Sequence, residues 1–347
     1  MAIAASLETP VINYWLTREC VSVAHLLVDA GRLALVTSHK YAIQTALLFV
    51  LLLSSYPATA QTYAVVVSGL GGATQYTEQF SATGKVVFES LQSLDVDDDL
   101  IVYLDETATR EIILDAIADI ASRINPDEPS VFSLFFIGHG NADSDGWRFN
   151  ISGPDLTTQD IVAALNPVNA SQQLVVLAAS ASGAALDILA QPQRVVVTAT
   201  KSGGENNAVK FPEFLAQALR VSDADYDRNE ILTIAEVFRF VDSRTVEYYE
   251  QEKLLAPEHA RLKGENAVDI AVALLGSLKN ATDDPAVASL LDERLILEDS
   301  FKQLKASKAG LVSSDYYTQL EKLLIKIALL QQSIDKATGW SERDAES

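Results

Sequence analysis

Cysteine and methionine are almost absent from this sequence of 347 residues, which has one of each, Cys20 and Met1. A single cysteine excludes a disulfide within the chain and the cysteine clusters of structural zinc sites. Histidine is also scarce, and after position 60 only His139 and His259 remain. Any form of the chain that begins after Cys20 therefore has no cysteine nucleophile.

Basic residues are far fewer than acidic ones. Lys and Arg number 26 against 47 Asp and Glu, which gives a net charge of −21 and an isoelectric point near 4.5. Phosphate groups would be repelled by such a surface, so we expect neither nucleic acid nor an anionic membrane as a partner. Solubility alone accounts for the acidity, and local calcium binding is the alternative.

Long hydrophobic runs are missing as well. Ala42–Leu53 is an apolar run too short to span a bilayer, and Ala58–Ala60 follows it as an A-x-A site. The pair predicts a signal peptide cut after Ala60, so that residues 1–60 are an N-terminal extension plus signal peptide. We expect export to a bacterial periplasm or the extracellular space, with a short membrane anchor as the alternative. The stretch before the run is unusual for a signal peptide, and a true start at Val36 would explain it.

Regular alternation of strand and helix patterns begins at Tyr63. The expected strands are 63–68, 99–104, 131–138, 174–179 and 194–199. The expected helices are 75–93, 109–124 and a third that follows a turn at Pro154, is capped near Thr157 or Thr158 and ends at Leu165. Such alternation is typical of an α/β fold with a mostly parallel sheet. The polar, glycine-bearing segment 141–153 is predicted to be a loop.

The last part of the chain reads as helical. Thr245–Arg261 has a helical pattern with a break at Pro257, and 285–307 and 314–337 are two long helical patterns joined by a short link. Apolar residues recur every three or four positions in the second, which favours a coiled-coil-like antiparallel hairpin. We expect this hairpin either to pack on the main domain or to present its apolar seam to a partner. We expect a domain at 61–245, a helical region at 246–337 and a tail at 338–347.

Two strand ends carry the candidate catalytic groups. His139 stands between two glycines after the third strand, and Ser180 begins a Ser-Ala-Ser-Gly turn after the fourth. In a parallel sheet the carboxyl ends of the strands meet at one edge, where ligands bind. We therefore expect His139 and Ser180 to lie together.

A second motif resembles an EF-hand loop. Asp225, Asp227 and Asn229 occupy loop positions 1, 3 and 5, Ile231 offers a carbonyl at position 7, and Glu236 is the carboxylate at position 12. Calcium prefers such an all-oxygen ligand set on a flexible loop. Position 6, however, is a glutamate where glycine usually makes the turn, and a left-handed non-glycine residue costs about 1–2 kcal/mol. A calcium site and a decayed loop that keeps its turn are both open.

Residues 63–240 resemble the caspase-like fold, nearest to legumain-type (asparaginyl endopeptidase) peptidases and their bacterial exported relatives. The motifs that carry the resemblance are 135–140 (FFIGHG) and 177–183 (LAASASG). The resemblance implies a three-layer α/β/α fold that ends, in this chain, in the helical hairpin. It also implies that His139 is the catalytic histidine, that Ser180 stands where the peptidases have cysteine, and that the Gly140 amide helps to form the oxyanion hole.

The serine leaves two functions open. A serine hydroxyl must lose its proton to a well-oriented base, whereas the family's histidine works in a dyad with no carboxylate clearly fixed against it. The first hypothesis is an exported pseudopeptidase that binds a peptide or protein partner. The second is a serine hydrolase acting on peptide or ester bonds, in which Asp143, Asp145 or Asn141 would orient the histidine. His259 is predicted to be a surface or structural histidine.

Overall fold

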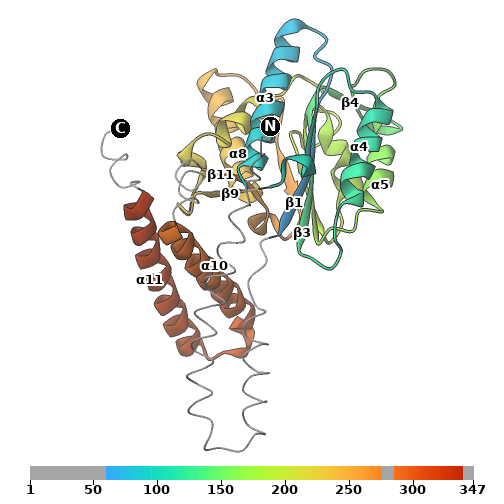
Figure 1. Ribbon diagram of the computed structural model, residues 1–347. Coiled ribbons are helices and arrows are strands. Elements are labelled where there is room, and N and C mark those ends of the chain that lie inside the picture. Colours follow the sequence, from blue (N-terminus) through green and yellow to red (C-terminus); the bar gives the residue numbers. More distant parts are fainter. Residues whose placement is uncertain (1–59, 95, 276–284, 339–347) are drawn as a thin grey trace, which may run out of the picture. The chain divides into compact units, whose positions relative to one another are not determined.

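The computed structural model describes residues 60–94, 96–275 and 285–338 (Figure 1). The apolar run 42–53, most of the predicted cleavage site and the tail from 339 onward lie outside the described residues. Within the described ranges, no helix is long and apolar enough to cross a membrane.

A six-stranded sheet forms the centre of the protein, in the order β10-β8-β7-β3-β1-β2. Five strands run parallel, and β10 forms one edge of the sheet by pairing antiparallel with β8. The bounds are β1 Gln61–Ser68, β2 Ile101–Leu104, β3 Ser130–Gly138, β7 Gln172–Ala179, β8 Arg194–Thr198 and β10 Arg261–Lys263. The predicted α/β fold with a mostly parallel sheet is confirmed.

Helices cover both faces of this sheet because its central strands are apolar on both sides. All nine residues of β3 are buried, and its alternating side chains enter two separate cores. One core packs against α3 Thr74–Gln92, α7 Phe211–Ala218 and α8 Ile234–Gln251, and the other against α4 Arg110–Ser122, α5 Thr158–Leu165 and α6 Leu186–Leu189.

The predicted loop at 141–153 is wrong, because this segment forms a hairpin. Its strands are β4 Gly140–Asp143 and β5 Gly146–Phe149, and β6 Leu156–Thr157 completes a small antiparallel sheet. Trp147 and Phe149 are fully buried while Arg148 between them is not, which is a two-residue strand period. Asn, Asp and Gly are frequent in this segment and are typical of loops, so the sequence pattern did not indicate strands.

The predicted helix Thr245–Arg261 is also wrong in its second half. Helix α8 ends at Gln251, and Lys253 just beyond it has a left-handed backbone with φ +56°. The chain then returns to the sheet as β10 rather than continuing as a helix.

Several shorter elements and a helical pair complete the structure. The strands β9 Ile231–Thr233 and β11 Ala271–Leu274 pair antiparallel. The 3-10 turns are η2 Asp98–Leu100, η3 Ser182–Ala185, η4 Ser222–Ala224, η5 Ala267–Asp269 and η6 Ser307–Gly310. Helices α10 Pro285–Ala306 and α11 Ser313–Thr338 pack against each other as the predicted hairpin (Figure 1).

Candidate functional site

Strand register brings the two predicted catalytic positions together. Gly138 pairs with Ala179 across β3 and β7, so His139 and Ser180 leave neighbouring strands at the same level. Neighbouring strands are about 4.8 Å apart. Strand β1 lies on the other side of β3, and the chain order reverses between β1 and β3, which is where ligands bind in open parallel sheets.

The His139 ring lies against helix α3. Its centroid is 4.8 Å from that of Tyr76 and 4.9 Å from that of Phe80, both in edge-on arrangements. Burial in this aromatic setting lowers the pKa of His139, and a hydrogen bond with the Gly71 backbone opposes the shift. The imidazole is therefore neutral near pH 7, with the Gly71 carbonyl as its hydrogen-bond acceptor.

Ser180 sits in a closely packed turn. The residue is 3% exposed, and its backbone carbonyl accepts a hydrogen bond of 3.0 Å from the Trp147 indole. A Cβ on Gly140 would lie 2.5 Å from the indole nitrogen and 2.8 Å from the Ser180 carbonyl oxygen. Only glycine fits at position 140, so the Gly-His-Gly motif is explained in part by this contact between the β4 strand and the serine turn.

The residue after Ser180 is held in an unusual conformation. Ala181 has φ +56°, and its amide donates to the Glu205 carbonyl at 2.8 Å. A left-handed non-glycine residue costs of order 1–3 kcal/mol and persists only where its surroundings enforce it. Gly183 packs so closely on the loop after β8 that an added Cβ would lie 2.2 Å from the Ser202 nitrogen.

The predicted orienting partners of His139 are engaged elsewhere. Asp143 and Asp145 form ion pairs with Arg148 at 3.0 and 3.2 Å. Asn141 donates to the Asn150 side chain at 3.0 Å. Among the described residues, no carboxylate contacts the His139 ring, and no hydrogen bond joins that ring to the Ser180 hydroxyl.

The polar loop 201–207 lies at the same edge of the sheet, and sequence reasoning missed that His259 joins it in a cluster around Glu205. The Glu205 carboxylate accepts from the His259 ring at 2.5 Å, from the Lys201 amide at 2.8 Å and from the His259 amide at 3.1 Å, and it pairs with the Lys201 ammonium at 3.2 Å. Burial opposes these donors, but together they lower the pKa of Glu205. The only sequence signal was the position of Lys201 and Glu205 after a strand end.

The hydrogen bonds of this cluster connect the loop after β8 to the Ser180 turn and to the segment after α8. Glu205 bonds to Ala181 through its backbone and to the segment after α8 through its side chain. Lys201 and His259 remain about half exposed, with side-chain exposures of 46% and 43%. The carboxyl edge of the sheet thus carries two accessible nitrogen-bearing side chains beside the serine turn.

The EF-hand-like loop brings three of its acidic side chains close together. Side-chain oxygens of Asp225, Asp227 and Glu236 lie within 4.8 Å of one another, an arrangement that can hold a metal ion. The Asp225 carboxylate accepts from the amides of Asn229 and Glu230 at 3.0 and 2.7 Å. Glu230 at position 6 has φ +61°, so the left-handed turn forms without glycine.

The last loop residues begin helix α8. Thr233, at position 9, caps the helix, and the Glu236 carboxylate accepts from the Thr233 amide and hydroxyl at 3.0 and 2.8 Å. Ile231 starts β9, which pairs with β11. The donor set, all oxygen and mostly carboxylate, suits a hard cation such as calcium.

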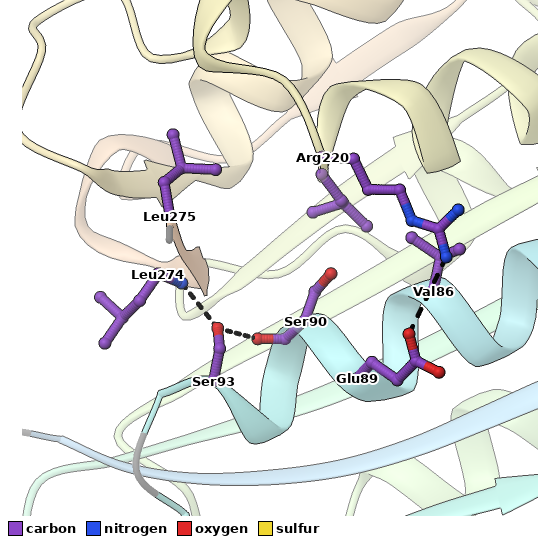
Figure 2. A pocket seen from close by; sticks show the side chains of 8 residues that line it. Val86, Glu89, Ser90, Ser93, Arg220, Leu274 and Leu275 are labelled. Carbon is purple, nitrogen blue, oxygen red and sulfur yellow. Dashed lines mark hydrogen bonds and ion pairs between the residues drawn. The ribbon is translucent and has the colours of Figure 1, made fainter. Parts of the chain in front are cut away.

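A surface hollow of about 240 Å³ lies elsewhere on the molecule (Figure 2). Its lining comes from the last turns of α3, the end of α7 and the end of β11: Val86, Glu89, Ser90, Ser93, Leu219, Arg220, Leu274 and Leu275. The Ser93 hydroxyl bridges Leu274 and Ser90, and Glu89 pairs with Arg220 at 3.8 Å. The Ser93 hydroxyl and the Glu89 carboxylate, both drawn in Figure 2, thus bond within the lining of the hollow. Ser90 follows Phe80 on α3 by ten residues, which is about 15 Å along the helix.

Comparison with known protein families finds no matching family, and a search of curated proteins finds no match either. Any statement about function therefore depends on the geometry of the site.

Proposed function

We propose that this protein is an exported, non-catalytic member of the caspase-like fold that binds a peptide or protein segment at the carboxyl edge of its sheet. The strand order, with the reversal between β1 and β3, supports a ligand site there. The legumain-type motifs at 135–140 and 177–183 meet at this edge. The fold-family assignment and the export are part of the proposal.

The single observation that carries the proposal is the state of His139. Its ring packs against Tyr76 and Phe80 and bonds to Gly71 rather than to Ser180 or a carboxylate. A serine nucleophile needs a base that is itself oriented by a third group. Since the candidate orienting groups bond elsewhere, a binding role fits the site better than acyl transfer.

A serine hydrolase is the second candidate, and one observation favours it. Ala181, directly after Ser180, has the strained left-handed backbone that often accompanies a functional turn. In this alternative Ser180 is the nucleophile, His139 the general base and the Gly140 amide an oxyanion donor.

A hydrolysis assay separates the two candidates. The protein from Gln61 to Ser347 is tested on a broad fluorogenic peptide and ester panel beside the variants Ser180→Ala and Ser180→Cys. The binding proposal expects a silent wild type. Wild-type hydrolysis that disappears in Ser180→Ala would instead establish the serine hydrolase.

Binding is tested directly with a peptide library read by fluorescence polarisation. We expect selected peptides to bind wild type and to bind Lys201→Glu more weakly, because Lys201 lies at the rim of the site. The matched control is Lys85→Glu on the exposed side of α3. No selective binding by wild type, or an equal loss in both variants, would contradict the proposal.

We further propose that the loop Asp225–Glu236 binds calcium. The clustered carboxylates and the left-handed turn at Glu230 support this. The ion would be held by Asp225, Asp227, Asn229, the Ile231 carbonyl and Glu236, and it would stiffen the junction between the loop and α8. A ligand that binds only the folded state raises its stability. The melting temperature should therefore rise with calcium in wild type and not in Asp227→Asn; an unchanged wild type at millimolar calcium would refute the site.

A further inference from the structure

The segment Glu258–Lys263, which ends in β10, alternates between buried and exposed positions. Glu258 and Ala260 are buried, and Leu262 packs against the core that α7 and α8 line. The side chains between them are exposed and all contain nitrogen: His259, Arg261 and Lys263. A period of two residues is that of an extended chain, so these three side chains leave the segment on one side.

Contacts on either side of the segment show which face of the sheet each set occupies. The Glu258 carboxylate accepts from the amides of Lys210 and Phe211 at 2.6 and 3.2 Å, where α7 begins. The Lys263 ammonium pairs with Asp187 of α6 at 2.7 Å. Helices α7 and α6 belong to opposite cores, so the exposed set lies on the α6 face of the sheet.

Lys201 adds a fourth nitrogen-bearing side chain where this set reaches the carboxyl edge of the sheet. Its ammonium is 3.4 Å from Nδ1 of His259, and its side chain is about half exposed. The four residues are called here the β10 basic row: Lys201, His259, Arg261 and Lys263. From His259 to Lys263 the row extends about 13 Å along the chain, and it begins at the rim of the proposed peptide site.

The basic row is unusual for its surroundings. Residues 61–284 contain 34 acidic and 15 basic residues, so cations are in the minority there. Charged side chains on an edge strand also prevent that strand from pairing with other chains, but the commoner carboxylates would serve this purpose as well. A continuous set of basic side chains along β10 therefore indicates a surface for an anionic ligand.

The carboxylates next to the row leave its cations accessible. Glu205, which pairs with Lys201, has a side chain only 11% exposed, and its two oxygens already accept from three N–H groups besides that ammonium. No carboxylate of the described residues forms an ion pair with Arg261, whose guanidinium donates to a backbone carbonyl. Asp187 is 86% exposed, so its ion pair with Lys263 contributes little. A bound carboxylate can thus pair with Arg261 directly and with Lys263 by replacing Asp187.

The geometry of the row suits an extended peptide. Alternate residues of an extended chain are about 6.7 Å apart, so carboxylates at every second position of a ligand can face Arg261 and Lys263 together. The row is one strand wide, and a broader polyanion such as nucleic acid would also meet the acidic surface around it. A second copy of this chain would place like charges opposite each other, which opposes self-association through the row.

We propose that the β10 basic row binds an extended acidic segment of the peptide or protein partner, in which Asp or Glu side chains occupy alternate positions. The inference rests on the proposed binding function and adds the chemical class of the ligand. Arg261 and Lys263 hold the carboxylates through charge-assisted hydrogen bonds, and Lys201 holds the end of the segment that reaches the serine turn.

Peptide binding by the chain from Gln61 to Ser347, nearly all of the compact unit 58–347, tests the class of ligand. Peptides that it selects from a random library should carry Asp or Glu at alternate positions. A fluorescein-labelled Glu-Thr-Glu-Thr-Glu peptide with blocked ends is the defined probe in fluorescence polarisation. It should bind more tightly than Thr-Glu-Glu-Glu-Thr and than its Gln counterpart, and more weakly when sodium chloride rises from about 50 mM to about 0.3 M.

Two pairs of variants test the residues. Arg261→Gln with Lys263→Gln should weaken binding of this probe about fivefold or more, the equivalent of two exposed ion pairs. The matched control is Lys85→Gln with Arg220→Gln, which removes two exposed cations on the other face of the sheet and should leave the affinity unchanged. Circular dichroism verifies that each variant is folded.

Charge reversal gives a gain of binding. Arg261→Glu with Lys263→Glu should lose the acidic probe and bind instead the peptide in which lysine replaces each glutamate, because the same positions then present carboxylates. A structural role of the two residues alone would not change the charge preference of the ligand.

Four results would contradict the inference, and they differ in meaning. Selected peptides that lack the acidic pattern and bind the paired Gln variant as well as wild type would refute the row but leave the proposed peptide binding intact. An equal loss in the control pair would mean that only net charge matters. Equally tight binding of a single-stranded DNA of the same charge would assign the row to polyanions in general. No selected peptide at all would refute the proposed function too.

Discussion

His139 illustrates how surroundings decide what a residue can do. Its aromatic neighbours partly bury the ring and favour its neutral form, and Gly71 takes the hydrogen bond that a catalytic partner would take. The same imidazole beside a carboxylate would be a stronger base. At this position the environment favours a packed, uncharged histidine.

The lowered pKa of His139 predicts a pH-dependent stability. The ordinary pKa of 6.5 applies to the unfolded chain, and the folded pKa lies below it. As pH falls through 6.5, the unfolded state takes up a proton first, so the free energy of unfolding decreases until the folded pKa is passed. His139→Phe, which keeps the ring packing, should lose less stability than wild type in denaturant titrations between about pH 7.5 and pH 5. Equal losses in the two proteins would contradict this.

Trp147 predicts a second effect at the scale of one residue. Trp147→Phe leaves the Ser180 carbonyl without its indole donor and should cost about 1–3 kcal/mol. Trp147→Ala adds a cavity in a fully buried position and should cost about 3–5 kcal/mol. Urea unfolding measures both, and a Phe variant as stable as wild type would mean that the hydrogen bond adds nothing.

At the scale of elements, local chemistry determines where helices begin. Helix α5 starts with a capping box in which Thr157 and Asp160 satisfy each other's backbone amides. Helix α4 starts at Thr109, whose hydroxyl accepts a longer bond of 3.4 Å from Ile112. Both starts were predicted from the sequence to within one or two residues, because a cap depends on neighbours within four positions.

The two caps give a matched pair of variants. Thr157→Ala should destabilise the protein by about 1 kcal/mol, since it removes a complete capping box. Thr109→Ala should cost less because its bond is longer. Thermal unfolding compares the two, and a larger loss at Thr109 would reverse the expected order.

At the scale of the whole molecule, charge opposes compaction. Residues 1–60 contain three acidic and three basic residues, the hairpin 285–338 is neutral, and residues 339–347 have a net charge of −2, so −19 of the net charge of −21 falls on residues 61–284, which include the sheet. Most ion pairs of the described residues are largely exposed and contribute little. Repulsion among the carboxylates is therefore the larger electrostatic effect.

Salt should therefore stabilise this protein. Raising sodium chloride from about 10 mM to about 0.3 M shortens the screening distance to a few ångströms and should raise the melting temperature. Potassium chloride should act equally, which separates screening from specific ion binding. A fall in melting temperature with salt would mean that the ion pairs outweigh the repulsion.

The sequence by itself determined the alternation of strands and helices, the edge at which His139 and Ser180 meet, and the turn of the Asp225–Glu236 loop. These depend on periodicity and on residue preferences over a few positions. Tertiary structure decided the rest. Glu205 meets His259 across 54 positions, β10 replaces a helical pattern by pairing with β8, and Trp147 is buried against the serine turn. Such contacts join residues far apart in the chain, and no local sequence pattern specifies which residues will be in contact.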